Sequence, residues 1–203
     1  MYAALYGSLF FMAQFLQTVL GAGPMTAGLQ LVPWTATVTV VAPAAGALVN
    51  RVGARPLTAA GLTLQGIGMG WIGLVAGPSA AYPDLVAPMV IAGAGISMAM
   101  PAAQTAVINS VAAREIGKAS GVFNALRQFA AVLGVAVAAA VFTAEGGYGT
   151  ARTFSDGFGP ALTLMGALSL AGALAGLFMP GPDRAARTSP AQPVPWPAPE
   201  PTR

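Results

Sequence analysis

The chain has 203 residues, of which 56% are hydrophobic and only 7% are charged, whereas a soluble domain usually carries about 25% charged residues. So little charge cannot cover a water-exposed surface, so we expect most of the chain to lie in a lipid bilayer. The net charge of +3 comes from scattered basic residues that form no stripe, which argues against nucleic acid as a partner. The absence of Cys and His excludes thiol chemistry and imidazole bases, so we expect no enzyme activity, catalytic residue, metal site or cofactor.

Apolar segments of about 20 residues follow one another along the chain, bounded by Gly, Pro or charge. Helices of about this length cross the hydrocarbon core of a bilayer. The predicted transmembrane helices are 1–20, 27–49, 57–77, 85–109, 119–143 and 160–179. The first starts at Met1 without a basic leader or cleavage signature, so it is interpreted as a spanning helix and not a signal peptide. Truncation is one explanation for so abrupt a start.

Basic residues outside the helices fall mainly after the second and fourth helices and in the C-terminal tail. Basic loop residues are retained on the cytoplasmic side of a membrane. The even connectors and both termini are therefore predicted to be cytoplasmic, in a plasma membrane. The residues on that side are Arg51, Arg55, Arg114, Lys118, Arg184, Arg187 and Arg203, against Arg152 on the other. The Pro-rich tail, 180–203, has the composition of a solvated, disordered or polyproline II segment, with a Pro-rich ligand as the alternative.

Arg127 is the ionisable residue that this prediction places deepest, about eight residues into the fifth helix. An ionisable group at membrane depth costs roughly 2.5–3.5 kcal/mol on insertion scales, which makes it a functional candidate. Asn124 and Gln128 share its helical face, which we expect to look inward. Two interpretations remain open: Arg127 bonds helix-end carbonyls and clamps the bundle, or it lines a polar cavity or meets a carboxylate.

Uncharged amides supply further candidates for a substrate pathway. Gln14 and Gln17 share a face of the first helix, and Gln104 follows Pro101 in the fourth. Each could bind a substrate or bond a neighbouring helix. No Asp or Glu falls inside a predicted helix, so any proton-coupling group would belong to another segment or subunit.

A loop signature connects the second and third predicted helices. Its matching positions are Gly46, Leu48, Asn50, Arg51, Gly53 and Arg55. Gly46 would let two helices approach, Gly53 would permit a tight turn, and the two arginines would complement the C-terminal dipole of the second helix. The loop resembles the cytoplasmic signature of the major facilitator superfamily, Gly-x-Leu-x-Asp-Arg-x-Gly-x-Arg/Lys. Asn50 stands where that family has Asp, which would weaken the charge latch.

Shorter motifs extend the resemblance along residues 1–179. They are Phe15-Leu16-Gln17 before Gly21, Ala27-Gly28-Leu29 and Leu31-Val32-Pro33, and Ala119-Ser120-Gly121 with Asn124, Arg127 and Gln128. In order and spacing they are similar to the last six helices of the fourteen-helix drug:proton antiporters, the EmrB/QacA-like branch. That resemblance implies an all-α membrane bundle of two inverted three-helix repeats, which rocks against a first half around a substrate site. It also implies that the coupling carboxylates lie chiefly in the first half.

The expected function is therefore that of a C-terminal half-transporter. Together with a missing N-terminal half, it would export small amphipathic drugs or metabolites by proton-coupled alternating access. A second copy of the chain is the alternative partner, giving a homodimeric facilitator. A truncated, non-transporting membrane remnant with a structural or regulatory role is the other alternative.

Overall fold

The structure, a computed structural model, describes residues 1–178, so the predicted tail lies outside the described residues. Within that range the regular secondary structure is helical throughout, which confirms the all-α prediction. The helices are α1 (Tyr2–Thr18), α2 (Pro24–Gln30), α3 (Val32–Val52), α4 (Ala54–Val75), α5 (Tyr82–Asn109), the 3-10 turn η1 (Ala113–Glu115), α6 (Ile116–Glu145) and α7 (Ala151–Leu177).

Five of these segments are long and apolar enough to cross a membrane, with α2 and α3 counted together as Pro24–Val49. α1, with 17 residues, is shorter than these five segments. The predicted second helix is divided at Leu31, because Pro33 lies in the first turn of α3, where its missing N–H costs no helical hydrogen bond. The segments otherwise follow the predicted order of spans.

The sixth predicted helix, 160–179, begins earlier than expected, at Ala151. Thr150 caps it: the Thr153 N–H donates to Thr150 Oγ1 at 3.1 Å, and the Thr150 N–H donates to Thr153 Oγ1 at 2.8 Å. Pro160, which suggested a start, lies inside the helix, where membrane helices tolerate proline. Asp156 consequently lies within α7, and its predicted position in a connector is wrong, although its side chain is exposed.

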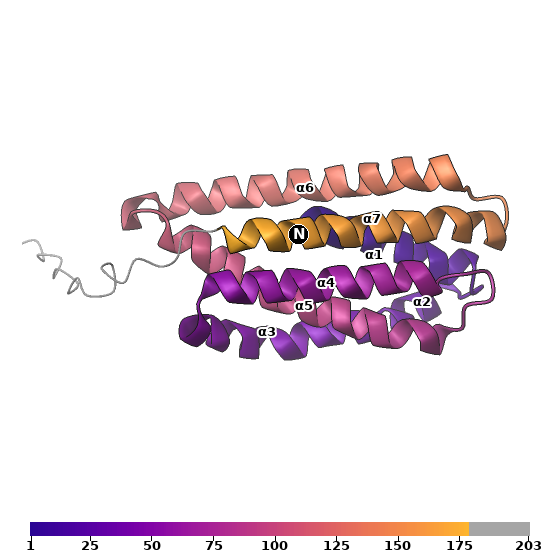
Figure 1. The fold of residues 1–203 in the computed structure, drawn as a ribbon, viewed down its shortest axis with the longest axis horizontal. Coiled ribbons are helices and arrows are strands. Elements are labelled where there is room, and N and C mark those ends of the chain that lie inside the picture. Colours follow the sequence, from indigo (N-terminus) through magenta and orange to yellow (C-terminus); the bar gives the residue numbers. More distant parts are fainter. Residues whose placement is uncertain (179–203) are drawn as a thin grey trace, which may run out of the picture.

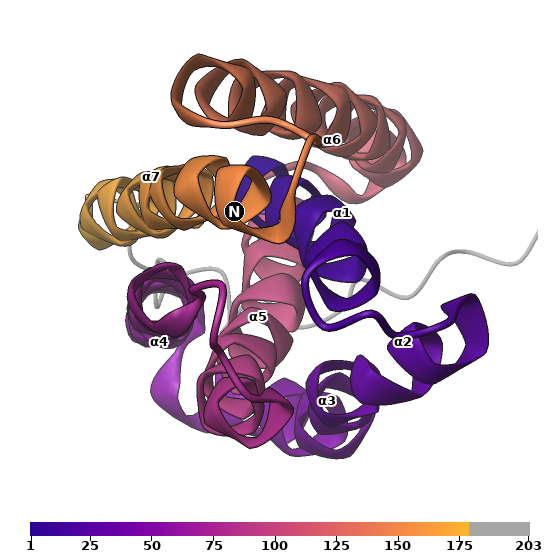
Figure 2. The same cartoon turned by 90° about the vertical axis from the view of Figure 1, so that its right-hand side faces the viewer.

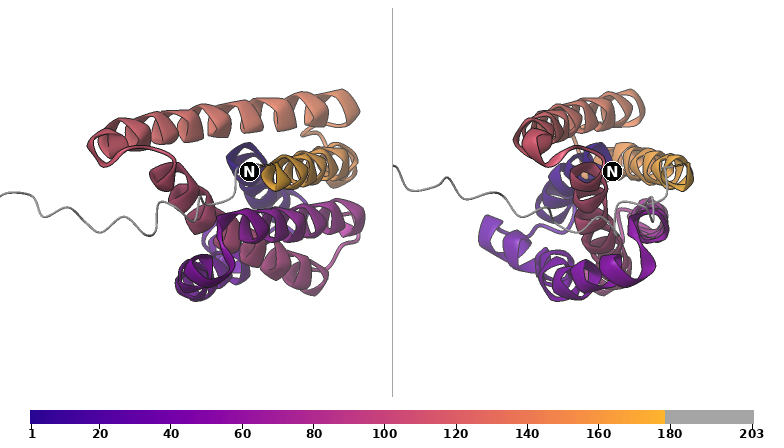
Figure 3. Two further views of the ribbon diagram at one scale, coloured as in Figure 1. Left: turned by 60° about the vertical axis from the view of Figure 1, so that its left-hand side comes forward. Right: turned by 90° about the vertical axis from the view of Figure 1, so that its left-hand side faces the viewer.

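The helices run roughly along one axis, and α5 crosses the bundle obliquely (Figures 1 and 3). Seen from the end, α5 lies centrally, with α4, α3 and α1 around it and α6 outermost (Figure 2). α4 packs on α5 and α7, and α1 packs on α6 and α7. About half of the most apolar stretch is buried in α4 (50%) and α5 (56%), but only 17% in α6 and in the α2–α3 segment. The latter two therefore present most of their apolar surface outward.

Glycines bring the central helices into backbone contact. A Cβ added to Gly61 would lie 2.6 Å from the Gly95 carbonyl oxygen, and one added to Gly73 would lie 2.8 Å from that of Gly159. Such approaches are common where lipid removes the hydrophobic drive for helix association. Ser169 adds a hydrogen bond between helices, since its hydroxyl donates to the Leu62 carbonyl oxygen of α4 at 3.2 Å.

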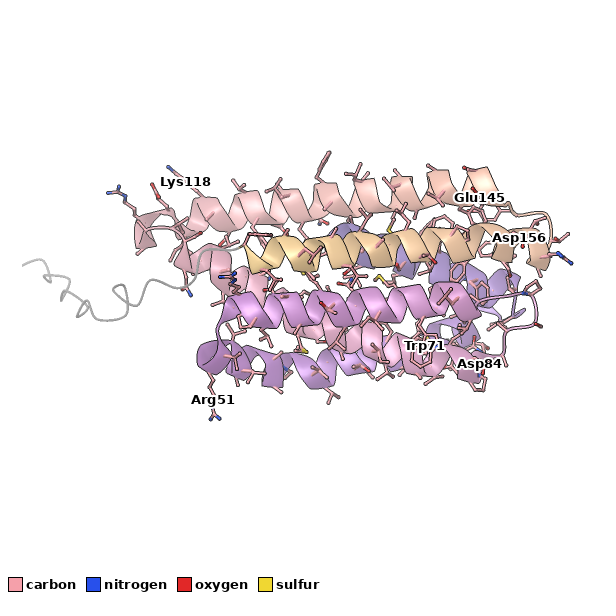
Figure 4. All side chains as sticks on the ribbon, viewed as in Figure 1. Arg51, Trp71, Asp84, Lys118, Glu145 and Asp156 are labelled. Carbon is pink, nitrogen blue, oxygen red and sulfur yellow. The ribbon has the colours of Figure 1, made fainter. Side chains whose placement is uncertain are left out.

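Charged residues gather at the two ends of the bundle, with most of the basic residues at one end and most of the acidic residues at the other. Arg51 and Lys118 lie at one end, the basic end, and Asp84, Glu145 and Asp156 lie at the other, the acidic end (Figure 4). The connectors that follow the second and fourth predicted helices therefore lie at a common end, as expected if their basic residues share one side of the membrane. The amino terminus does not reach the basic end, because Met1 packs inside the bundle beside Leu62 and Ala173 (Figure 1).

Candidate functional site

An apolar groove of about 620 Å³ runs between α1 and α6. Its lining residues recur three or four positions apart on each helix, so they share one face of it. They are Tyr6, Leu9, Phe10, Ala131, Val132, Val135, Ala136 and Ala139. The helices can approach here because Gly134 offers no side chain, and its Cα lies against the backbone of Ala3. The groove has the volume of a small-molecule site and a lining suited to an apolar ligand.

Arg127 and Tyr2 lie one helical turn beyond the groove, toward the basic end. Tyr2 precedes Tyr6 by four residues and Arg127 precedes Ala131 by four, so the pair continues the two walls. The Arg127 guanidinium carbon lies 5.6 Å from the centre of the Tyr2 ring, a cation–π contact. The Arg127 Nε and the Tyr2 hydroxyl are both buried, and neither makes a well-formed hydrogen bond among the described residues, although the hydroxyl lies near the guanidinium.

The charge of Arg127 has no carboxylate near it in the described part of the chain. Glu115 precedes it by twelve residues, about 18 Å along a helix, and is exposed. Asp84, Glu145 and Asp156 lie at the acidic end (Figure 4). Arg127 itself is half-buried, about 16 Å beyond the first residue of α6. Arg127 is therefore a cation deep within an apolar helix, and its contact among the described residues is the Tyr2 ring.

The predicted inward face of Asn124, Arg127 and Gln128 is divided in the structure. Arg127 turns toward α1, whereas the side chains of Asn124 and Gln128 are exposed. Gln128 precedes Val132 by four residues, so both amides lie on the flank of α6 that continues into the groove. Their place in a substrate pathway stays a prediction.

The other predicted amides do not gather at the groove. Gln17 is exposed and donates to the Ala13 carbonyl oxygen of its own helix at 3.0 Å. Gln14 is half-buried on α1, and Gln104 is exposed on α5. Within residues 1–178 none of these amides makes a hydrogen bond to another helix, so the structure supplies no bond for the helix-linking interpretation.

Sequence reasoning missed two buried polar side chains. Tyr2 is 7% exposed and forms the described contact of Arg127. Gln65, in the middle of α4, is fully buried, and neither amide atom has a hydrogen-bond partner among the described residues. The signal for Gln65 was an amide in an otherwise apolar helix, which could have been singled out by the argument used for Arg127.

The loop signature lies at the basic end, between α3 and α4. Gly53 ends α3 with φ of 97°, a conformation that favours glycine, which matches its predicted role in a tight turn. Arg51 lies in the last turn of α3, where a cation complements the helix dipole, but Arg55 lies in the first turn of α4. The expected close approach at Gly46 is absent among the described residues, because an added Cβ there would meet no atom within 4 Å. Leu48 is 39% exposed, and the Asn50 side chain is outside what the structure describes.

The two signature glycines should therefore respond differently to alanine. Gly53→Ala should destabilise the protein by about 1–2 kcal/mol, because a side chain at positive φ is strained. Gly46→Ala should be neutral or stabilise by up to about 1 kcal/mol, because it replaces a helical glycine facing open space. Denaturation of the purified variants in detergent measures both changes. Equal losses at the two positions would contradict the described turn.

The chain belongs to the Major Facilitator Superfamily, whose family description it matches over residues 1–201. It is 33% identical over 141 residues to the Multidrug resistance protein Stp of Mycobacterium tuberculosis strain H37Rv, covering 70% of this chain and 26% of that protein. It is 35% identical over 137 residues to the Uncharacterized transporter YebQ of Escherichia coli K12, covering 67% and 30%.

A third relative is the Cephamycin export protein CmcT of Amycolatopsis lactamdurans, 32% identical over 164 residues, which cover 80% of this chain and 33% of that protein. The chain thus matches about a quarter to a third of the length of these curated relatives. Family and fold together define a multi-pass membrane protein of a transporter family.

Proposed function

We propose that this chain forms one six-helix half of an exporter of small amphipathic compounds. The groove between α1 and α6 carries the proposal, because it joins a largely apolar lining to a half-buried cation at one end. An amphipathic molecule needs that combination of surfaces. The names of two relatives, a multidrug resistance protein and a cephamycin export protein, support the same class of activity.

The proposed working unit contains a second bundle that covers the outward surfaces of α6 and the α2–α3 segment. The small buried share of these two helices supports it, as does the limited part of each relative that the chain matches. In this proposal the two halves move by alternating access, and the proton-coupling carboxylate lies in the second bundle. The basic end faces the cytoplasm of a plasma-membrane protein, following the retention of basic loops on that side.

A resistance assay in efflux-deficient bacteria tests the proposal. One strain produces this chain alone, and another produces it fused behind the part of Stp that precedes the aligned region. A third strain produces the Stp part alone as control, and immunoblots of membranes confirm insertion in each. We expect drug resistance from the fusion only.

Resistance from this chain alone would contradict the need for a second bundle, and crosslinking in membranes would then test for a homodimer. A fusion that inserts but gives neither resistance nor export of any compound in a drug panel would favour the non-transporting alternative.

A further inference from the structure

The pairing of an apolar groove with a cation that lacks a counter-charge identifies a class of ligand. We propose that the groove and Arg127 bind an amphipathic anion, with the apolar body between α1 and α6 and the anionic group against the guanidinium. This inference rests on the proposed function and adds the sign of the substrate's charge.

Arg127 is a half-buried cation within the apolar helix α6. A half-buried cation at membrane depth is stable only when it is paired or hydrated. Its Nε is buried without a hydrogen-bond partner, and its described contact is the face of the Tyr2 ring at 5.6 Å. Every carboxylate in residues 1–178 lies at an end of the bundle, as described above. The guanidinium therefore keeps donors available for an oxygen anion, which it can bind in a bidentate manner.

The groove leaves room beside that cation for an apolar body. The volume of about 620 Å³ accommodates an aromatic or acyl body, and the lining side chains are apolar apart from the Tyr6 hydroxyl. Tyr2 and Tyr6 lie four residues apart on α1, so their rings occupy one face that leads from the groove to Arg127. The Tyr2 hydroxyl is buried near the Arg127 guanidinium without a well-formed hydrogen bond among the described residues, and it adds a second donor for an anion.

Arg127 and the residues that line the groove should also disfavour cationic ligands. Neither the groove-lining residues nor Tyr2 and Arg127 include a carboxylate. A cationic ligand in the groove would approach Arg127 without compensation, and repulsion between like charges is strong in a site of low dielectric. The sign of the preferred charge thus follows from this half of the site.

The test compares two ligands with the same body, 1-pyrenebutyrate and its uncharged amide, 1-pyrenebutanamide. Their export is measured with the fusion transporter in proteoliposomes of phosphatidylcholine, with and without phosphatidylglycerol. The variants are Arg127→Gln and Arg127→Lys, with Arg152→Gln as the control that removes an exposed positive charge at the acidic end. Thermal denaturation in detergent reports whether each variant is folded.

We expect the unmodified protein to export the acid at least about tenfold more efficiently than the amide, as the loss of a charge-assisted hydrogen bond would predict. Arg127→Gln should abolish that preference while amide export continues, Arg127→Lys should restore part of it, and Arg152→Gln should leave it unchanged. Equal export of acid and amide by the unmodified protein would overturn the inference even if Arg127→Gln fails to fold.

An equal loss of both ligands in a folded Arg127→Gln variant would also overturn it, by assigning Arg127 to the bundle or to a carboxylate of the second half. If an anionic lipid is the true occupant, export of both ligands by the unmodified protein would require phosphatidylglycerol. Export by the Arg127→Gln variant would not. Failure to export any member of a drug panel would instead count against the proposed function.

Discussion

Gly68→Ala is expected to destabilise the bundle by about 1–3 kcal/mol, although it adds a single methyl group. That carbon would lie 2.6 Å from the Ala92 nitrogen and 2.7 Å from the Pro88 carbonyl oxygen, both backbone atoms of α5. A flexible side chain could move aside, but the backbone of the central helix can move only if α5 is displaced. Denaturation of the purified protein in detergent measures the loss.

Gly70 is the matched control, two residues further along α4. An added Cβ there would meet no atom of the described residues within 4 Å. Gly70→Ala should therefore leave stability unchanged or raise it by up to about 1 kcal/mol, since alanine is the better helix former. If the two variants lost equal stability, or if Gly68→Ala were harmless, the close packing of α4 on α5 would be contradicted.

The spans were largely predictable because the bilayer restricts the possible structures. A backbone in hydrocarbon must bond internally, so an apolar segment of sufficient length becomes a helix. The start of α7 was not predictable from hydropathy, because residues 151–159 contain Arg152 and Asp156 and precede Pro160. The reciprocal bonds of Thr150 and Thr153 define that start, and they are a local signal that composition conceals.

Several glycines lie four residues apart along the helices, a spacing typical of close helix contacts in membranes. Gly66 and Gly73 are each followed by another glycine four residues later, and added side chains at both would meet the backbone of α7. Gly117 and Gly121 share the same spacing, yet added side chains there would meet nothing within 4 Å in residues 1–178. A spacing of four shows that two residues share a face, but only the tertiary arrangement shows what that face meets.

The candidate site was predictable in part. The cost of a charge in lipid was enough to single out Arg127. Its contact with Tyr2 and the groove beside it depend on α1 packing parallel to α6, two helices separated by about 100 residues of chain. The sequence pattern of neither helix indicates that α1 packs against α6. Gln104 of α5, which the sequence indicated as a candidate for the substrate pathway, is not among the residues that line the groove.

We expect the groove between α1 and α6 to face a substrate pathway and not lipid. The chain contains no Cys, so once any cysteines in the Stp part of the fusion are replaced, a single introduced cysteine reports on one position. Val135 lines the groove. Ile67 is 50% exposed on α4, which is separated from α6 by α7 (Figure 2). If both positions faced lipid, neither introduced cysteine would be accessible to water.

Labelling with a membrane-impermeant thiol reagent, applied to each side of the membrane in turn, tests this claim in the fusion transporter. We predict that Val135→Cys is labelled from at least one side, that an exported drug slows its labelling, and that Ile67→Cys stays unlabelled. Val135→Cys that is as unreactive as Ile67→Cys, or labelling that exported drugs do not change, would contradict the account.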